Sequence, residues 1–152
     1  MKTYDVVIGQ GIGPIQLGMP CEEAEALLGE YEPNNFQPYG RDYTIHEDIS
    51  ENFIVSYDKA QKVNFICFTN SENAALTLDG EPLSEWSCYE LFMKFHELDP
   101  DMEFDSGGFT SDALGFGRTF RSETLTDENS RAYTCDVVDT LQVATKNYWK
   151  EY

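Results

Sequence analysis

The chain has 152 residues, of which 41% are hydrophobic and 14% aromatic, enough for a packed core in one domain or in two small repeats. It carries 28 acidic and 10 basic residues, and a formal charge of −18 repels phosphate backbones, which argues against direct nucleic-acid binding. The acidic residues occur along the whole chain among aromatic ones, which indicates a folded acidic surface that serves either association with a basic partner or simply solubility.

The first third of the chain predicts a strand, a glycine-rich turn and a short helix. Residues Tyr4–Ile8 are apolar and β-branched at their centre, which is typical of a strand. Residues Cys21–Leu28 predict a helix, because acidic residues fill its first turns, where the helix dipole favours negative charge. Gly29 then supplies a left-handed stop.

The next stretch predicts a loop followed by three strands. Residues Glu32–Pro38 are rich in Pro and Asn and predict the loop. The strands are expected over about Arg41–His46, Phe53–Tyr57 and Lys62–Thr69, with residues 57–62 forming the tip of a hairpin.

A second helix is predicted after a turn at Asp79-Gly80. Ser87 and Glu90 form a capping box, and apolar residues then recur at helical spacing until Asp99-Pro100 ends the pattern. Alternating residues around 114–121 and 133–143 predict further strands, with Thr126–Arg131 as the loop between two of them.

These elements predict an α+β fold in which one or more antiparallel sheets are covered by short helices. The pattern of a helix followed by β-rich sequence occurs twice, which suggests one domain over residues 1–152 with possible repeats 1–78 and 79–152. Because no low-complexity linker separates the halves, we expect their sheets to be continuous or closely abutting.

The residues from Gly9 to Gly29 resemble a family signature. The pattern Gly-x-Gly-Ile-Gly-x-Ile-x-Leu-Gly-Met, followed by Glu-Glu-Ala-x-x-Leu-Leu-Gly, is similar to that of the SmpA/OmlA helix–sheet domain, and Pro82–Leu98 echoes it loosely. Pro20 stands where the family usually places Ser or Thr. Tandem copies of this domain occur in β-lactamase-inhibitor proteins, and the chain also looks like immunity proteins encoded beside bacterial polymorphic or contact-dependent toxins.

We predict no metal, cofactor or catalytic residue. The four cysteines, which include Cys21, are far apart and lack Cys-x-x-Cys spacing, and neither His46 nor His96 has a partner at zinc-ligand spacing. His46, next to Glu47 and Asp48, would be the better general base, but no nucleophile motif accompanies it. The glycine-rich Gly9–Pro14 lacks the last glycine of a dinucleotide fingerprint.

One group of acidic residues is the preferred candidate for contact with a partner. Asp99, Asp101, Glu103 and Asp105 alternate as residues on one side of a strand do, and they lack the glycine and glutamate of a calcium loop. Glu47 and Asp48 are further candidates.

The resemblance and the charge together favour a non-catalytic cytoplasmic immunity protein that binds and neutralises a basic toxin domain, such as a nuclease. The alternative is a bacterial protein- or ligand-binding module with another partner. An enzyme is the third hypothesis, and a deep polar pocket around His46 would favour it. The cytoplasmic location is expected because the first residues lack a signal-peptide pattern and no run approaches 18 apolar residues.

Overall fold

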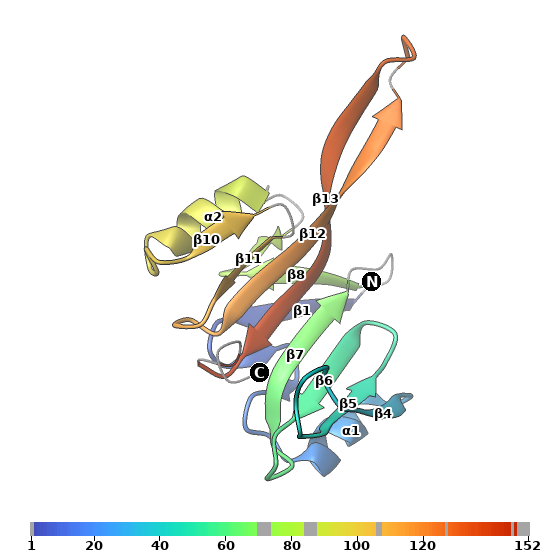
Figure 1. The fold of residues 1–152 in the computed structure, drawn as a ribbon, viewed down its shortest axis with the longest axis vertical. Helices are drawn as coiled ribbons and strands as arrows, with labels where there is room; N and C mark the ends of the chain where they lie inside the picture. Colours follow the sequence, from blue (N-terminus) through green and yellow to red (C-terminus); the bar gives the residue numbers. More distant parts are fainter. Residues whose placement is uncertain are drawn as a thin grey trace.

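The computed structural model describes residues 2–69, 74–83, 88–105, 108–126, 128–146 and 148. Over these residues the chain forms two short helices and two β-sheets (Figure 1). The predicted α+β class is confirmed. Each half of the described chain contains a strand, a helix and then four consecutive antiparallel strands. A duplication of the two halves stays a prediction.

The smaller sheet has five strands within the described residues. Their order is β3-β2-β1-β8-β9, and β1 pairs with β8 in parallel, whereas the other neighbours are antiparallel. The strands are β1 (Lys2–Val7), β2 (Gly11–Ile12), β3 (Ile15–Gln16), β8 (Ala74–Leu78) and β9 (Glu81–Pro82).

The larger sheet has eight strands within the described residues, all of them antiparallel to their neighbours. Its order is β10-β11-β12-β13-β7-β6-β5-β4, so the two halves of the chain meet where β7 pairs with β13. Over the described residues the larger sheet is therefore continuous across both halves. The strands are β4 (Glu32–Phe36), β5 (Ile45–Ile49), β6 (Phe53–Tyr57), β7 (Val63–Thr69), β10 (Glu103–Asp105), β11 (Gly108–Ser111), β12 (Phe116–Thr126) and β13 (Ala132–Ala144).

Two sequence predictions in the first half need correction. The stretch predicted as a loop, Glu32–Pro38, contains strand β4, and the strand predicted at Arg41–His46 lies later, as β5. Pro33 lacks a backbone N–H, which weakens any strand pattern, but β4 is the edge of the sheet, where a proline is tolerated.

Helix α1 (Cys21–Leu28) has the predicted bounds, and its start is held by the backbone of a hairpin. Pro20 is extended and no side chain caps the helix. Instead, the Cys21 N–H donates to the Gln61 carbonyl at 2.9 Å, and the Val63 N–H donates to the Met19 carbonyl at 2.9 Å. The tip of the β6–β7 hairpin therefore replaces the missing cap.

Two glycines of the signature before α1 are required by close packing. A Cβ atom at Gly11 would meet the carbonyl oxygen of Ile15, and one at Gly13 would lie 2.5 Å from the Tyr4 ring. Gly13 also has a positive φ of 58°. The two glycines are therefore required by the shape of the turn.

Helix α2 (Cys88–His96) packs against the second half of the larger sheet. The centroids of the Phe95 and Phe116 rings lie 4.4 Å apart, and the Phe92 ring contacts Phe109 edge-on. The predicted cap at Ser87 lies outside the described residues. The helix ends before Asp99, whose N–H donates to the Phe95 carbonyl in the turn that follows.

A single hydrophobic core lies between the two sheets and the helices. Val6 and Leu76 of the smaller sheet face it, as do Val55, Ile66 and Val143 on one face of the larger sheet. The neighbouring residues on these strands, such as Cys67 and Gln142, alternate to the other face. The inner face thus explains most of the apolar and aromatic residues in these strands.

Strands β12 and β13 extend beyond the body as a twisted hairpin (Figure 1). Residues 120–126 pair with residues 132–138, whereas β11 and β7 pair only with residues 116–119 and 140–144. The turn lies where Thr126–Arg131 was predicted as a loop. Over the paired segment the hairpin is a two-stranded ribbon with no neighbouring strand among the described residues.

Candidate functional site

The acidic group at residues 99–105 does not form one side of a strand. Only Glu103 and Asp105 lie on β10, and their side chains lie outside the described part of the structure. Asp99 and Asp101 precede the strand in a turn. The Ser111 hydroxyl donates to the Asp99 carboxylate at 2.6 Å, and the Asp101 N–H donates to it at 3.3 Å. Asp99 therefore organises the turn, and the alternation predicted from the sequence is wrong.

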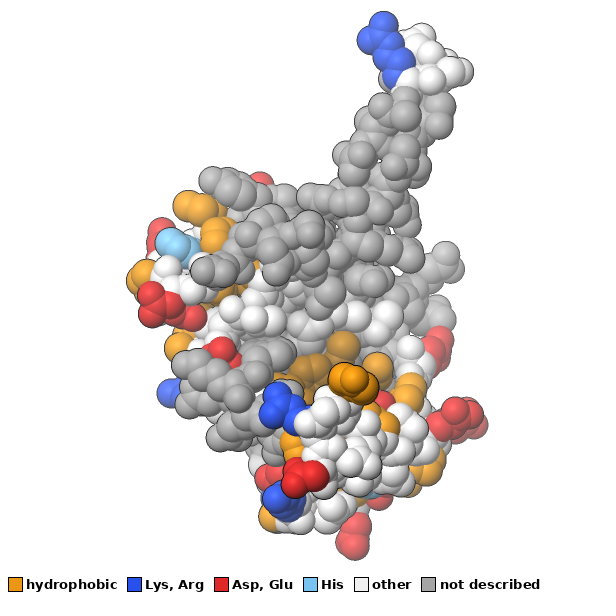
Figure 2. Space-filling view, in the orientation of Figure 1, with side chains coloured by type: hydrophobic (Ala, Val, Ile, Leu, Met, Phe, Trp, Pro, Cys, Tyr) orange, Lys and Arg blue, Asp and Glu red, His pale blue; other side chains and the backbone are white. Residues whose placement is uncertain are grey.

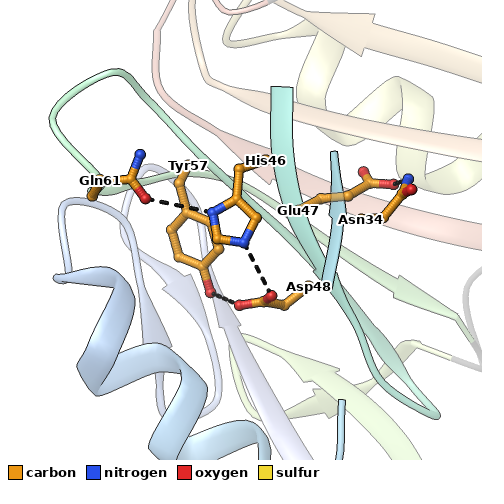
Figure 3. Close-up of polar contacts among 6 residues, drawn as sticks. All are labelled: Asn34, His46, Glu47, Asp48, Tyr57 and Gln61. Atoms are coloured by element: carbon orange, nitrogen blue, oxygen red, sulfur yellow. Dashed lines mark hydrogen bonds and ion pairs between the residues drawn. The ribbon is translucent and has the colours of Figure 1, made fainter. Parts of the chain in front are cut away.

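Glu47 and Asp48 lie on opposite faces of β5 (Figure 3). Glu47 is half-buried and accepts a hydrogen bond from the Asn34 side chain at 3.1 Å. Asp48 is 0% exposed and points toward the core. A fully buried carboxylate cannot meet a partner at the surface, so the prediction that Asp48 is a contact residue is wrong.

Asp48 belongs to a cluster of polar side chains beneath α1. The helix contributes Cys21 and Glu25, and β5 contributes His46 and Asp48. One thiol, imidazole or carboxylate atom from each of these residues lies within 4.8 Å of the corresponding atom of every other. The residues are four apart on the helix and two apart on the strand, so each pair lies on one face of its element.

Tyr57 and Gln61 hold the strand half of this cluster in place (Figure 3). The Tyr57 hydroxyl donates to Oδ2 of Asp48 at 2.7 Å, and Nδ1 of His46 lies 3.4 Å from Oε1 of Gln61. The amide oxygen accepts a hydrogen bond from Nδ1 in those protonation states of the ring that carry a proton there. Nε2 of His46 then faces Oδ1 of Asp48 at 3.3 Å.

The cluster does not have the electrostatics of a cysteine nucleophile. Burial, together with the nearby Glu25 carboxylate, raises the pKa of the Cys21 thiol to about 11. Reactive cysteines instead have a lowered pKa, because cationic neighbours stabilise the thiolate. Burial and the hydrogen bond to Asp48 likewise raise the pKa of Tyr57. At neutral pH both groups keep their protons.

A pocket of about 260 Å³ opens beside the cluster. Its lining includes His46 and Tyr57 from the cluster and Tyr43, Lys59 and Gln61 from the adjoining loops. The sequence did not reveal the polar environment of His46, because residue spacing within one helix or strand does not show which elements pack together. The combined signal of Cys-x3-Glu on a helix and His-x-Asp on a strand could have indicated it.

A larger groove of about 660 Å³ lies between the end of α1 and the edge of the larger sheet. Leu27 and Ile49 contribute apolar surface and are 46% and 37% exposed. Three exposed acidic residues and one exposed lysine also line it: Glu30, Glu32, Glu51 and Lys2. The groove therefore joins apolar surface to an excess of negative charge.

Neither helix, over the described residues, is long and apolar enough to cross a membrane. No protein-family model matches the chain, and no significant match was found among curated proteins or solved structures.

Proposed function

We propose that this protein is a non-catalytic, cytoplasmic, immunity-type inhibitor that binds a basic toxin domain. The observation that carries the proposal is the uncompensated negative charge of a folded body. If each of the 10 Lys and Arg residues neutralised one carboxylate, 18 acidic side chains would still lack a cation. Figure 2 displays Asp and Glu side chains at several separate places around the body. Such a field accelerates association with a basic protein.

The groove beside α1 is the best candidate for the contact surface. A lysine or arginine side chain of the partner can lay its methylene stem along Leu27 and Ile49 and direct its charged head to the surrounding carboxylates. This combination favours a basic protein over an acidic or neutral one. The exposed acidic residue Asp101, on the turn after α2, adds to the field.

The chemistry of the polar cluster supports a binding role over catalysis. A thiol with a raised pKa is a poor nucleophile, and the raised pKa of Tyr57 disfavours proton transfer from its hydroxyl near neutral pH. The projecting β12–β13 hairpin also suits a binding protein, because the edges of its two strands expose backbone groups that a partner strand can pair with.

The alternative is a binding module whose partner is not a toxin. Genomic neighbourhood separates the two functions, because an immunity protein is encoded beside its toxin. We expect the tagged protein, co-expressed with the product of the adjacent gene, to retain that product through purification and to protect cells from it. A neighbour without toxicity that does not co-purify would contradict the immunity role.

Charge reversal in the groove tests the contact surface. We expect the triple lysine variant of the groove to bind the toxin at least about 10-fold more weakly, because it replaces attraction by repulsion. Binding is measured by calorimetry with the purified toxin domain. The substituted residues are Glu30, Glu32 and Glu51.

A second triple variant changes the net charge equally at exposed positions that do not line the groove. It distinguishes a local contact from the long-range field, and its residues are Asp42, Glu81 and Glu97. We expect it to slow association only modestly and to leave the dissociation rate unchanged. Equal losses of affinity in the two variants would show that the groove is not the contact surface.

A further inference from the structure

The cluster beneath α1 brings together four side chains that are all metal ligands in proteins. Cys21 offers a sulfur atom, His46 a ring nitrogen, and Glu25 and Asp48 carboxylate oxygens. They come from two elements of the fold, with Cys21 and Glu25 on one face of α1 and His46 and Asp48 on one face of β5. An ion between these four atoms would connect the helix to the sheet.

Hydrogen bonds in the cluster leave two ligand atoms directed at each other. Nδ1 of His46 faces the Gln61 amide oxygen at 3.4 Å, and Tyr57 donates to Oδ2 of Asp48. Nε2 and Oδ1 remain, 3.3 Å apart. In metalloproteins, hydrogen-bond partners of the ligating histidines and carboxylates fix the tautomer and orientation of the ring in the same way.

Asp48 provides an independent sign of a missing cation. Its side chain is 0% exposed, and its Oδ1 atom accepts no hydrogen bond from the described residues; the group that faces it is Nε2 of His46, at 3.3 Å, which is a cation only when the ring is doubly protonated. A buried carboxylate oxygen without a hydrogen bond is costly unless a positive charge faces it. The neighbouring acidic residue Glu25 makes the need for positive charge larger.

The distances fit a small tetrahedral ion. Bond lengths of about 2.0 Å to nitrogen and oxygen and about 2.3 Å to sulfur place tetrahedral ligand atoms roughly 3.3–3.8 Å apart. The His46–Asp48 separation of 3.3 Å already has this value, and the four atoms lie within 4.8 Å of one another. A contraction of about 1 Å, achieved by side-chain rotation, completes the site.

We propose that Cys21, Glu25, His46 and Asp48 bind a single zinc ion that fastens α1 to the larger sheet. Thiolate and imidazole ligands favour zinc over calcium or magnesium, which take oxygen ligands. Four protein ligands close the coordination shell, which is the arrangement of structural rather than catalytic zinc sites. This site is separate from the acidic groove, and neither proposal depends on the other.

Metal content and cobalt substitution test the proposal on the full chain. We expect the protein purified from zinc-supplemented medium to contain one zinc ion per chain. After EDTA treatment, CoCl₂ should produce a thiolate-to-cobalt charge-transfer band, and ZnCl₂ should displace it. We also expect the thermal unfolding midpoint to fall on EDTA treatment and to recover with ZnCl₂.

Two cysteine variants identify the sulfur ligand. Cys21→Ser should abolish the charge-transfer band, whereas Cys67→Ser, at the other buried cysteine in the described chain, should retain it. His46→Gln should weaken zinc binding at least about 100-fold, since it removes a ligand altogether.

Gln61→Ala keeps the test valid if the ligand variants do not fold, because Gln61 is exposed and its side chain contacts His46, while its backbone carbonyl, which accepts from the Cys21 N–H, is retained in the variant. We expect this variant to fold normally and to bind zinc about 10- to 100-fold more weakly. A metal-free protein that takes up neither zinc nor cobalt would overturn the proposal. A cobalt spectrum unchanged by Cys21→Ser would do the same, and so would zinc affinity unchanged by Gln61→Ala.

Discussion

Asp48 shows how one buried side chain changes the interpretation of its neighbours. From the sequence it belongs to a polar run with His46 and Glu47, typical of an exposed strand. In the structure the strand alternates, so that Glu47 faces Asn34 while His46 and Asp48 face α1 (Figure 3). The carboxylate of Asp48 then depends on Tyr57 and His46 for polar contacts.

This dependence predicts that Tyr57→Phe destabilises the protein. The substitution removes the hydroxyl that donates to Asp48 at 2.7 Å and leaves the rest of the ring in place. Hydrogen bonds to charged groups contribute about 1.5–3 kcal/mol, and we expect a loss of this size in the free energy of unfolding, measured with urea.

Tyr39→Phe is the matched control, because Tyr39 is 105% exposed and the same atom is removed there. Its effect should stay within about 0.5 kcal/mol. If the two variants were equally stable, the hydrogen bond to Asp48 would make no net contribution to stability.

At the scale of elements, the two halves of the β12–β13 hairpin differ in whether other strands pair with them. Residues 116–119 and 140–144 lie within the larger sheet, whereas residues 120–126 and 132–138 pair only with each other among the described strands. Two-stranded ribbons are marginally stable in water unless other structure covers them.

The ribbon is therefore expected to open more often than the body. In hydrogen–deuterium exchange followed by mass spectrometry, amides of residues 120–126 and 132–138 should exchange at least about 100-fold faster than those of β6 and β7. Peptides from β6 and β7 provide the internal control, since these strands lie within the sheet. Equal protection of ribbon and body would mean that the ribbon is covered in solution. Binding of the toxin should slow exchange in the ribbon if the partner pairs with its edges.

At the scale of the whole molecule, the net charge of −18 acts against the compact state, because like charges lie closer together after folding. Two ion pairs among the described side chains are His46–Asp48, which requires a protonated imidazole, and Lys94–Asp79, in which the Asp79 side chain is 71% exposed. Exposed pairs contribute little to stability, so they offset the repulsion only weakly.

Salt is accordingly expected to stabilise this protein. Raising NaCl from about 10 mM to about 200 mM shortens the screening length from about 30 Å to below 10 Å and weakens the repulsion. We expect the thermal unfolding midpoint of the protein without its partner to rise by several degrees, as measured by circular dichroism.

Equal ionic strength supplied by sodium sulfate serves as the comparison, because sulfate also strengthens apolar burial and should raise the midpoint further. A midpoint that is independent of NaCl would show that the acidic residues are too far apart to repel one another appreciably.

Much of the fold followed from local sequence patterns. The bounds of α1, the β6 strand, the tip of the β6–β7 hairpin and the loop before β13 were all predicted, because helical spacing and turn residues act over a few positions. Strand β4 was missed because its polar residues and Pro33 resemble a loop, and pairing with β5 at the sheet edge outweighs that tendency.

The candidate sites were less accessible to sequence reasoning. The acidic groove combines Leu27 and Glu30 with Ile49 and Glu51, and no spacing rule links residues so far apart. The alternation at residues 99–105 was misleading, since a turn takes up its first half and Asp99 contributes its carboxylate to that turn.

The sequence alone determined the composition of this protein, its negative charge and the location of its helices, because these depend on residue type and short-range spacing. Only the tertiary structure decided that Cys21 and Glu25 meet His46 and Asp48. That meeting requires β5 to present its even-numbered residues to the core and α1 to lie over them. Strand register and helix docking are set by long-range burial of apolar surface, so a change of one residue in the register would turn Asp48 outward and disperse the cluster.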